Sequence, residues 1–235
     1  MDRLDEIRAI LAGSKVCPES PIPSQRPAYY FPSLTARAWW PKEDFECVAY
    51  LERNALVIRR ELEHVLADGD GFQPYVQPEG KIHDSGDWDV LYLYFHGKTF
   101  AENQRRCPET ARIISGIERR GGMIYFSRLT PGTRIARHCG LTNVKLRCHL
   151  GLVVPDGCGL RVGDEGRTWE EGKCLVFDDS FEHEVWHDGS RDRVVLIVDF
   201  YHPELSVEEI GLIEHAEKYL LATAFGGWNE ILNAR

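Results

Sequence analysis

A change in hydrophobic spacing at Gly122 most constrains how this chain can fold. From there to Tyr201, short apolar runs alternate with turn residues, a pattern of successive strands rather than helices. The runs are GMIYFSRLT (122–130), RCHLGLVV (147–154), KCLVFDD (173–179) and RVVLIVDFY (193–201). Because these strands are short and are separated by turns such as Pro-Gly and Pro-Asp-Gly, the segment predicts a two-sheet jelly roll.

The flanking regions have other patterns. Apolar residues spaced three or four apart predict helices at 2–12, from about 43 to 67, over 108–122 and after Pro203. Five prolines between Pro18 and Pro32 exclude a regular helix there and predict an extended segment across the surface. The run DWDVLYLYFHGK (87–98) predicts an early strand.

We therefore expect a mainly β protein with flanking helices around a double-stranded β-helix core of the jelly-roll, cupin-like type. The expected organisation is a single catalytic domain, 1–235. Within it, 1–121 is a mostly helical and extended support region with the early strand, 122–201 is the jelly-roll core, and 202–235 is a C-terminal helix.

Composition limits the classes of function. The chain has 235 residues, 43% of them hydrophobic, which suffices for one large core. A net charge of −9 with scattered acidic residues argues against a nucleic-acid partner, and no apolar run is long enough for membrane insertion. Seven cysteines without a CxxC pair suit a reducing compartment. Together with an N-terminus unlike a signal peptide, these features predict a soluble cytoplasmic protein, with an oligomeric state that the sequence does not indicate.

Two of the nine histidines differ from the rest. His138 and His183 each lie beside turn residues at the edge of a predicted strand in the jelly-roll half. Two imidazoles from separate strands suit a mononuclear Fe(II) site. The usual iron oxygenase signature is His-x-Asp or His-x-Glu followed by a distant histidine, but here glycine occupies the carboxylate position, Gly140. On the residues alone, metal binding and a structural role in the core both stay open.

Basic residues in the predicted strands indicate anion binding. Arg193 opens the most apolar strand, where an unpaired guanidinium would be costly, so a dicarboxylate cosubstrate and a structural ion pair are both plausible partners. Lys145, Arg147 and His149 alternate along KLRCHLGLVV and therefore share one face of their strand. That face is either an anion pocket or a solvent-exposed surface.

Two segments resemble a known family. HCGLTNVKLRCHLGLVVP (138–155) and TWEEGKCLVFDDSFEHEVWHDGSRDR (168–193) resemble the hallmark segments of the aspartyl/asparaginyl β-hydroxylases, which are Fe(II)- and 2-oxoglutarate-dependent dioxygenases. Weaker similarity extends through GDWDVLYLY (86–94), LERN (51–54) and Trp39-Trp40. This family binds iron through two histidines with glycine at the usual carboxylate position, so Gly140 becomes a matching feature.

The resemblance implies a role for each candidate site residue. His138 and His183 would ligate Fe(II), with water in the vacant position, and Asp179 would hydrogen-bond that water without ligating the metal. The residues that would hold 2-oxoglutarate are Ser127 and Arg193 at its distal carboxylate and Arg147 and His149 at the carboxylates nearest the metal.

Two departures from the family leave the substrate open. Lys145 stands where the animal enzymes have arginine for the substrate carboxylate, and Tyr94 stands where they have tryptophan near the cosubstrate. The implied reaction uses dioxygen and 2-oxoglutarate to hydroxylate a small-molecule or peptide substrate that carries a carboxylate, with succinate and CO2 as coproducts. An aspartyl or asparaginyl residue, free or carrier-bound aspartate and a lipid acyl chain are candidates. A cupin-like module that binds without turnover and a structural protein with core histidines are the rival classes.

Overall fold

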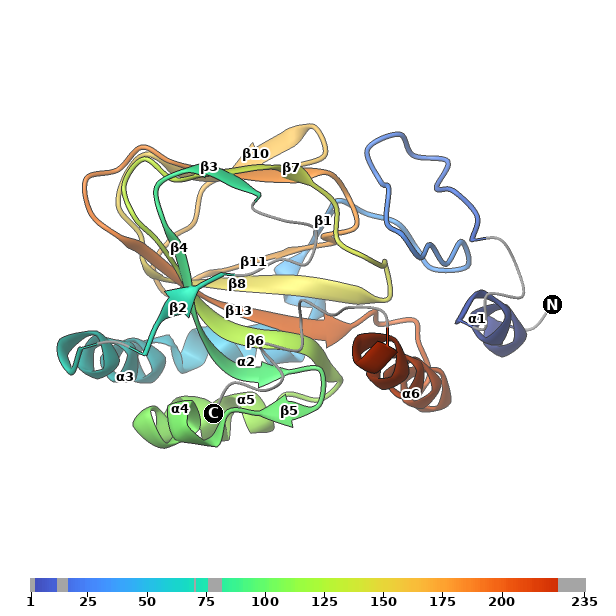
Figure 1. Ribbon diagram of the computed structural model, residues 1–235, viewed down its shortest axis with the longest axis horizontal. Helices are drawn as coiled ribbons and strands as arrows, with labels where there is room; N and C mark the ends of the chain where they lie inside the picture. The colour runs from blue at the N-terminus through green and yellow to red at the C-terminus, as the bar shows by residue number, and fades with distance from the viewer. Residues whose placement is uncertain (1–2, 12–16, 70, 76–81, 224–235) are drawn as a thin grey trace.

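The structure is a computed structural model of the chain and describes residues 3–11, 17–69, 71–75 and 82–223. Two antiparallel sheets face each other and form the jelly roll that the sequence predicts (Figure 1). The large sheet has the order β1 (Trp39–Trp40), β11 (Cys174–Phe177), β8 (Lys145–Val153), β13 (Arg193–Tyr201), β6 (Arg120–Leu129), β4 (Trp88–Phe95) and β2 (Gln73–Pro74), with β5 (Lys98–Thr99) paired to β4. The small sheet has the order β10 (Glu165–Arg167), β9 (Cys158–Val162), β12 (His183–His187), β7 (Arg134–His138) and β3 (His83–Ser85).

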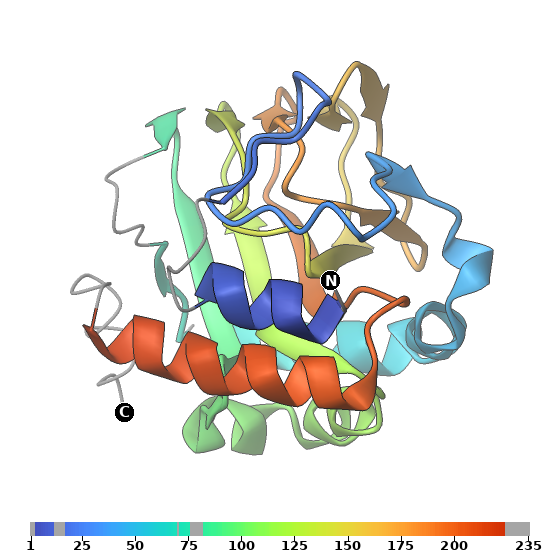
Figure 2. The ribbon, with the colours of Figure 1, turned by 90° about the vertical axis from the view of Figure 1, so that its right-hand side faces the viewer.

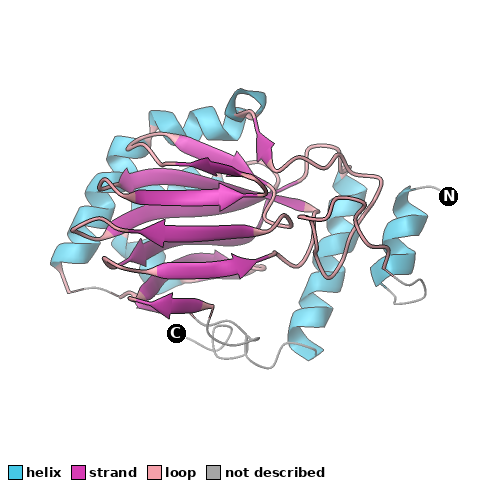
Figure 3. Ribbon diagram, turned by 90° about the horizontal axis from the view of Figure 1, so that it is seen from above, coloured by secondary structure: helices cyan, strands magenta, loops and turns pink. Residues whose placement is uncertain are grey.

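Helices cover the outer face of the large sheet, opposite the small sheet (Figure 3). These are α2 (Glu46–Arg53), α3 (Ala55–Ala67), α4 (Ala101–Arg106) and α5 (Pro108–Ser115), preceded by the short helix η1 (Lys42–Asp44). One apolar cluster joins α2, α3 and α5 to this face, and a second fills the space between the two sheets. Each central strand of the large sheet is therefore buried on both sides, which explains why RVVLIVDFY is almost entirely apolar.

The remaining helices, α1 (Arg3–Leu11) and α6 (Val207–Thr223), lie side by side across one end of the jelly roll (Figure 2). An ion pair between Arg3 and Glu209 joins them. Among the described residues, no helix combines the length and the apolar character that crossing a bilayer requires.

The proline-rich segment is extended, as the sequence predicts, and crosses the same end of the jelly roll. It makes isolated β-bridges from Gln25 to Phe181 and from Tyr29 to Thr142. The side chain of Asn143 both donates to and accepts from the backbone of Phe31, at 3.0 and 2.9 Å. The segment is therefore fixed to the loop that follows β7.

Two predicted helices are wrong in extent. The helix predicted from about 43 to 67 is divided at Asn54, where φ is −101° and ψ is 3° and the side-chain amide donates to the carbonyl of Tyr50. An asparagine side chain competes with the helical backbone for hydrogen bonds, which favours such a break. The helix predicted over 108–122 ends at Ser115, with Gly116 as its C-cap; Arg119 then adopts a positive φ of 60°, and β6 begins at the next residue.

Candidate functional site

The two candidate metal ligands lie directly opposite each other on neighbouring strands. His138 ends β7, His183 begins β12, and their Cα atoms are register partners. The centroids of the two imidazole rings are 4.1 Å apart. Pairing of the small sheet therefore brings together two residues that are far apart in the sequence.

Backbone carbonyls determine which nitrogen of each imidazole carries the proton. Nδ1 of His138 lies 2.8 Å from the carbonyl oxygen of Ala136, and Nδ1 of His183 lies 2.9 Å from that of Phe181. Because a carbonyl oxygen only accepts, each Nδ1 is the protonated donor and each Nε2 keeps its lone pair. This is the tautomer that a metal ligand needs.

Burial keeps both rings neutral. It lowers the pKa of His138 below its ordinary value, and it lowers that of His183 further, with added repulsion from His138. Neutral imidazoles with a free Nε2 fit a divalent transition metal such as Fe(II). No group of three or more His, Cys, Asp or Glu side chains arranged for a metal occurs in the part of the chain that the structure describes.

A cavity of about 450 Å³ opens beside His138, and its lining includes Glu217 of α6 and Arg26 of the proline-rich segment. These two elements lie at the same end of the jelly roll (Figure 2). Its walls combine apolar side chains with charged ones. The charged residues and histidines that line it are Arg26, His96, His138, Lys145, Arg147, Asp179, Asp199 and Glu217. Such a mixture is typical of a small-molecule site.

Asp179 lies against the glycine that replaces the usual carboxylate. The amide of Gly140 donates to the backbone carbonyl of Asp179 at 2.6 Å. A Cβ on Gly140 would meet the two carboxylate oxygens of Asp179 at 2.5 and 2.7 Å, closer than real Cβ atoms approach. The carboxylate of Asp179 therefore occupies the space that a side chain at position 140 would need.

Arg147 connects two buried carboxylates. Its Nη1 lies 2.9 Å from Asp179, while Nε and Nη2 donate to Asp199 at 2.8 and 3.0 Å. Burial opposes the charge of Arg147, but Asp179 and Asp199 raise its pKa well above the ordinary value. Burial likewise raises the pKa of Asp179, against the attraction of Arg147. Arg147 thus already holds two internal anions.

Arg193 lacks such a partner. Its side chain is buried, and its hydrogen bond to the carbonyl of Ser127 is long, at 3.4 Å. Its Nε has no hydrogen-bond acceptor, and no Asp or Glu of the described segments forms an ion pair with it. Burial lowers its pKa to about 10, so it remains a cation at neutral pH. The structural ion pair that the sequence left open is thus not found among these residues.

His149 presents a second buried donor without a partner. The indole Nε1 of Trp169 donates to Nδ1 of His149 at 3.3 Å, so the proton of the neutral ring is on Nε2. That Nε2 is buried and has no acceptor. Burial, with the nearby charges of Arg147 and Arg193, lowers the pKa of His149 well below its ordinary value.

Trp169 links the two unpartnered donors. Its ring lies 4.7 Å from the guanidinium of Arg193 and is stacked against His149 with centroids 6.0 Å apart. A buried cation and a buried N–H donor that share one neighbour need an anionic or strongly polar acceptor.

The other predicted site residues have distinct locations. Ser127 is buried next to Arg193, and its hydroxyl accepts from the indole of Trp88 at 3.1 Å. Tyr94 packs with the helix-side cluster and does not line the cavity beside His138. The register of β4 shifts between Tyr92 and Tyr94, and Tyr92 lies instead between the sheets with its hydroxyl buried and unpartnered.

Lys145 is paired with the C-terminal helix. Its ammonium contacts the carboxylate of Glu217 on α6, and it also lies 5.4 Å from the ring of Tyr201. Its side chain is only 9% exposed, so the solvent-exposed alternative for the basic face of β8 is wrong at this residue.

Four polar or aromatic contributors were not selected from the sequence: Tyr92, Trp169, Asp199 and Glu217. Asp199 had a visible signal, since a carboxylate interrupts an otherwise apolar strand. Trp169 and Glu217 had none, because their contacts depend on a loop and a helix that reach the site only in the folded chain.

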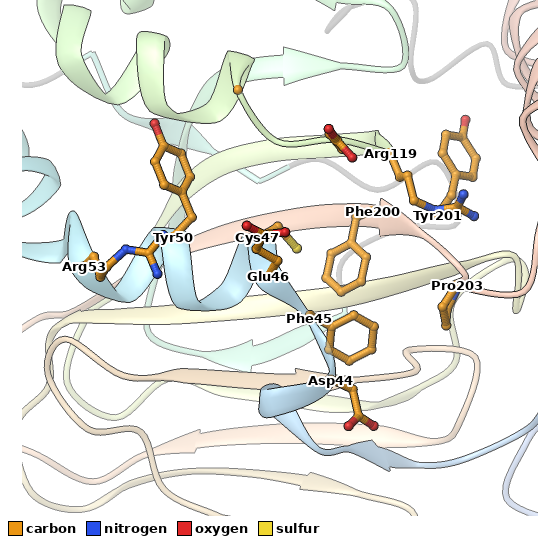
Figure 4. A pocket seen from close by; sticks show the side chains of 12 residues that line it. Asp44, Phe45, Glu46, Cys47, Tyr50, Arg53, Arg119, Phe200, Tyr201 and Pro203 are labelled. Atoms are coloured by element: carbon orange, nitrogen blue, oxygen red, sulfur yellow. The ribbon is translucent and has the colours of Figure 1, made fainter.

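A second cavity, of about 410 Å³, lies on the helix side of the large sheet (Figure 4). It is bounded by η1, α2 and the chain around Arg119, and its lining includes Cys47, Tyr50 and Phe200. None of the predicted site residues lines it, and burial raises the pKa of Cys47 to about 11, which keeps its thiol protonated at neutral pH. The histidine pair is therefore the candidate functional site.

The fold and this site define a cupin-like jelly-roll protein with paired neutral histidines beside a charged cavity. Residues 52–203 match the sequence model of the family described as Aspartyl/Asparaginyl beta-hydroxylase. The chain belongs to this family. The resemblance seen in the two hallmark segments is thereby confirmed.

Curated relatives agree with this assignment. The chain is 40% identical over 193 residues to the aspartyl/asparaginyl beta-hydroxylase of Mus musculus, a match that covers 79% of this chain and 26% of that protein. It is 38% identical over 198 residues to aspartate beta-hydroxylase domain-containing protein 2 of Xenopus tropicalis, covering 79% of this chain and 53% of that protein. The chain thus spans a quarter to about half of the length of these relatives, whose names describe hydroxylases.

Solved structures with a similar arrangement are more distant. A prolyl-4-hydroxylase from Pseudomonas putida aligns with a TM-score of 0.43 at 18% identity, covering 66% of this chain and 98% of that one. A cupin-like protein from Thermotoga maritima aligns with a TM-score of 0.35 at 14% identity, covering 58% of this chain and 84% of that one.

Proposed function

We propose that the protein is an Fe(II)- and 2-oxoglutarate-dependent dioxygenase that hydroxylates a carboxylate-bearing substrate. The preferred target is the β-carbon of an aspartyl or asparaginyl residue, or of free or carrier-bound aspartate, with succinate and CO2 as coproducts. Family membership supports hydroxylation of this kind of substrate. The cosubstrate and the metal are inferred from the donors that the site offers.

One observation carries the proposal. The paired imidazoles keep metal-binding nitrogens free, while the same interior holds a buried arginine that has no carboxylate partner among the described residues and whose Nε has no acceptor, and a buried histidine N–H without an acceptor. A protein with core histidines alone would have no physical reason to bury an unpaired Arg193, because an uncompensated charge in the interior is costly. A metal and a dicarboxylate satisfy both parts of the arrangement.

The site residues would have separate chemical roles. Bound iron with 2-oxoglutarate would supply the oxidant that inserts one oxygen atom of dioxygen into a C–H bond. His138 and His183 would hold the metal, and Arg193 with His149 would bind carboxylate oxygens of the cosubstrate. Asp179, fixed by Arg147, would present its carboxylate beside the metal in place of a ligand from position 140.

The cavity walls suit both substrate selection and the exclusion of water. Apolar side chains, among them Ile82, Trp88 and Met123, line it together with the charged groups. They would limit hydration around the reacting C–H bond, and Lys145 would attract the substrate carboxylate. We further propose a reducing, cytoplasmic location, because all seven cysteines are free thiols.

The test is succinate formation from 2-oxoglutarate by purified protein with Fe(II) and ascorbate. Free aspartate, aspartyl peptides and carrier-bound aspartate would be supplied in turn. We expect one of them to gain a single oxygen atom and to raise turnover. The His138→Ala variant should lose this activity, while His64→Ala, which removes an exposed histidine from α3, should keep it.

Two results would redirect the assignment. Binding of iron and 2-oxoglutarate without succinate from any carboxylate substrate would favour a lipid acyl chain or a module that binds without turnover. Absence of iron binding in anaerobically purified protein would contradict the proposal and return both histidines to a structural role.

A further inference from the structure

One wall of the cavity beside His138 carries a carboxylate from the C-terminal helix. Glu217 on α6 lines the cavity, contacts the ammonium of Lys145, and lies 3.3 Å from Nδ1 of His96. Its side chain is 17% exposed, and those of Lys145 and His96 are 9% and 13% exposed. These three side chains therefore form a desolvated polar cluster at the wall of the site.

We infer that Glu217 and Lys145 together select a substrate that carries an ammonium group beside a carboxylate, that is, a free α-amino acid. This inference rests on the proposed hydroxylation of a carboxylate-bearing substrate. Lys145 would bind the α-carboxylate, and Glu217 would bind the α-ammonium. Glu217 is thus a specificity-determining residue.

Hydrogen-bonding capacity permits both contacts at once. An ammonium has three donors, so Lys145 can hold Glu217 and a substrate carboxylate together. A carboxylate has about four acceptor positions, so Glu217 can accept from a substrate ammonium while it keeps Lys145 and His96. Burial opposes ionisation of Glu217, but Lys145 and His96 lower its pKa to about 2, and it is an anion at neutral pH.

Charge balance in the cavity favours a zwitterion at this wall. Arg147 is already matched by Asp179 and Asp199, and Lys145 is matched by Glu217. A substrate with carboxylates alone would place an anion next to Glu217, and like charges at close range in a desolvated site are unfavourable. An α-amino acid adds one charge of each sign next to the matching protein group.

This wall also disfavours a residue inside a peptide. There the α-nitrogen is a neutral amide that continues into further chain, and that chain would have to pass Glu217 and α6. A free amino acid ends at its ammonium and needs no such passage. The low exposure of Lys145 and Glu217 therefore points to the same substrate class as the charges.

This carboxylate lies outside the segment that matches the family's sequence model. The family match ends at residue 203, whereas α6 begins at Val207. The metal ligands and the unpartnered donors lie within the match, so α6 adds a substrate contact to the shared chemistry.

The test compares two ligands that share both carboxylates and differ in the group on the α-nitrogen. L-aspartate keeps its ammonium, whereas N-acetyl-L-aspartate has a neutral amide and the same two carboxylates. Binding of each to full-length protein with Fe(II) and 2-oxoglutarate would be measured by anaerobic calorimetry, and kcat/KM by succinate formation. Glu217→Gln removes the charge at constant size, and Glu208→Gln, at an exposed position on α6, is the matched control.

We expect wild type to bind L-aspartate at least about tenfold more tightly than N-acetyl-L-aspartate. Glu217→Gln should weaken the binding of L-aspartate by about 10- to 100-fold, which is the effect of losing a charge-assisted hydrogen bond. The affinity for N-acetyl-L-aspartate should stay within about twofold of the wild-type value. Glu208→Gln should change neither. Equal effects of Glu217→Gln on both ligands, or no discrimination by wild type, would overturn the inference.

The proposed hydroxylase function and the proposed role of Glu217 can be contradicted by different results. Succinate formed with an aspartyl peptide but not with free aspartate would overturn the role of Glu217 and leave the hydroxylase proposal intact. If no substrate yields succinate and 2-oxoglutarate does not bind, the proposed function fails and the inference fails with it.

Discussion

The carboxylate of Asp179 occupies the space beside the backbone of Gly140 into which a side chain at position 140 would extend. The two residues are also joined by a backbone hydrogen bond of 2.6 Å. Replacing the usual carboxylate ligand by glycine therefore does not leave a void. It makes room for a carboxylate that is supplied from the other side of the site and held by Arg147.

The first prediction is that Gly140→Ala impairs catalysis more than folding. Its methyl group would displace Asp179, and a misplacement of this size costs about 10- to 100-fold in rate. Succinate formation checks this, with Gly166→Ala as the control, because a Cβ there meets Trp186 at an ordinary 3.6 Å. Gly140→Asp should likewise bring no gain, and a clearly faster Gly140→Asp enzyme would contradict the spatial argument.

The two buried arginines should respond to substitution in opposite ways. Arg193→Met removes an unpaired charge and should raise the free energy of unfolding by about 1–3 kcal/mol while abolishing 2-oxoglutarate binding. Arg147→Met leaves Asp179 and Asp199 without their cation and should lower the free energy of unfolding by about 3–5 kcal/mol. Urea unfolding at neutral pH measures both. Destabilisation of similar size by the two variants would show that Arg193 has a structural anion.

Asp178 should make stability depend on pH. Burial raises its pKa from 3.8 to about 7, so the folded protein keeps a proton that the unfolded chain loses in this range. The stabilising contribution is complete below about pH 4 and is lost as the pH rises through about 7, amounting to a few kcal/mol. The free energy of unfolding of wild type should therefore fall, relative to that of Asp178→Asn, as the pH rises from 4.5 to 7.5. The free energy of unfolding of Asp156→Asn, a substitution at an exposed position, should depend on pH in the same way as that of wild type.

Trp169 should affect cosubstrate affinity through the tautomer of His149. Trp169→Phe removes the indole N–H that reserves Nδ1 as an acceptor, so the Nε2 donor is no longer fixed. We expect 2-oxoglutarate to bind roughly three- to tenfold more weakly, as for the loss of one hydrogen bond. Calorimetry with anaerobic Fe(II) protein measures this. Trp39→Phe, which loses an indole bond to the carbonyl of Glu165, should not change the affinity.

Much of the core could be predicted because strand periodicity is a local signal. The run 193–201 coincides with β13, and 122–130 and 147–154 match β6 and β8 to within two residues. Helix limits were harder to predict, because the break at Asn54 and the early end of α5 depend on single residues whose effect is decided by the surrounding packing.

The site shows the same division. Alternation along β8 correctly placed Lys145, Arg147 and His149 on one face. The sequence could not show that Arg147 is already paired while Arg193 is not, since ion pairing is a property of the folded surroundings. Nor could it show the contact of Glu217 with Lys145, which depends on how α6 packs.

The alternation on β8 has a consequence for how this protein can diverge. Leu146, Cys148 and Leu150 belong to the helix-side core, while their neighbours in the sequence face the opposite side of the sheet. Substitutions at Leu146, Cys148 or Leu150 should therefore act on stability through the helix-side core, whereas substitutions at Lys145, Arg147 or His149 act on the side of the sheet that faces the other sheet. A strand of nine residues thus joins the helix-side core, on one face, to the residues that face the interior between the sheets, on the other.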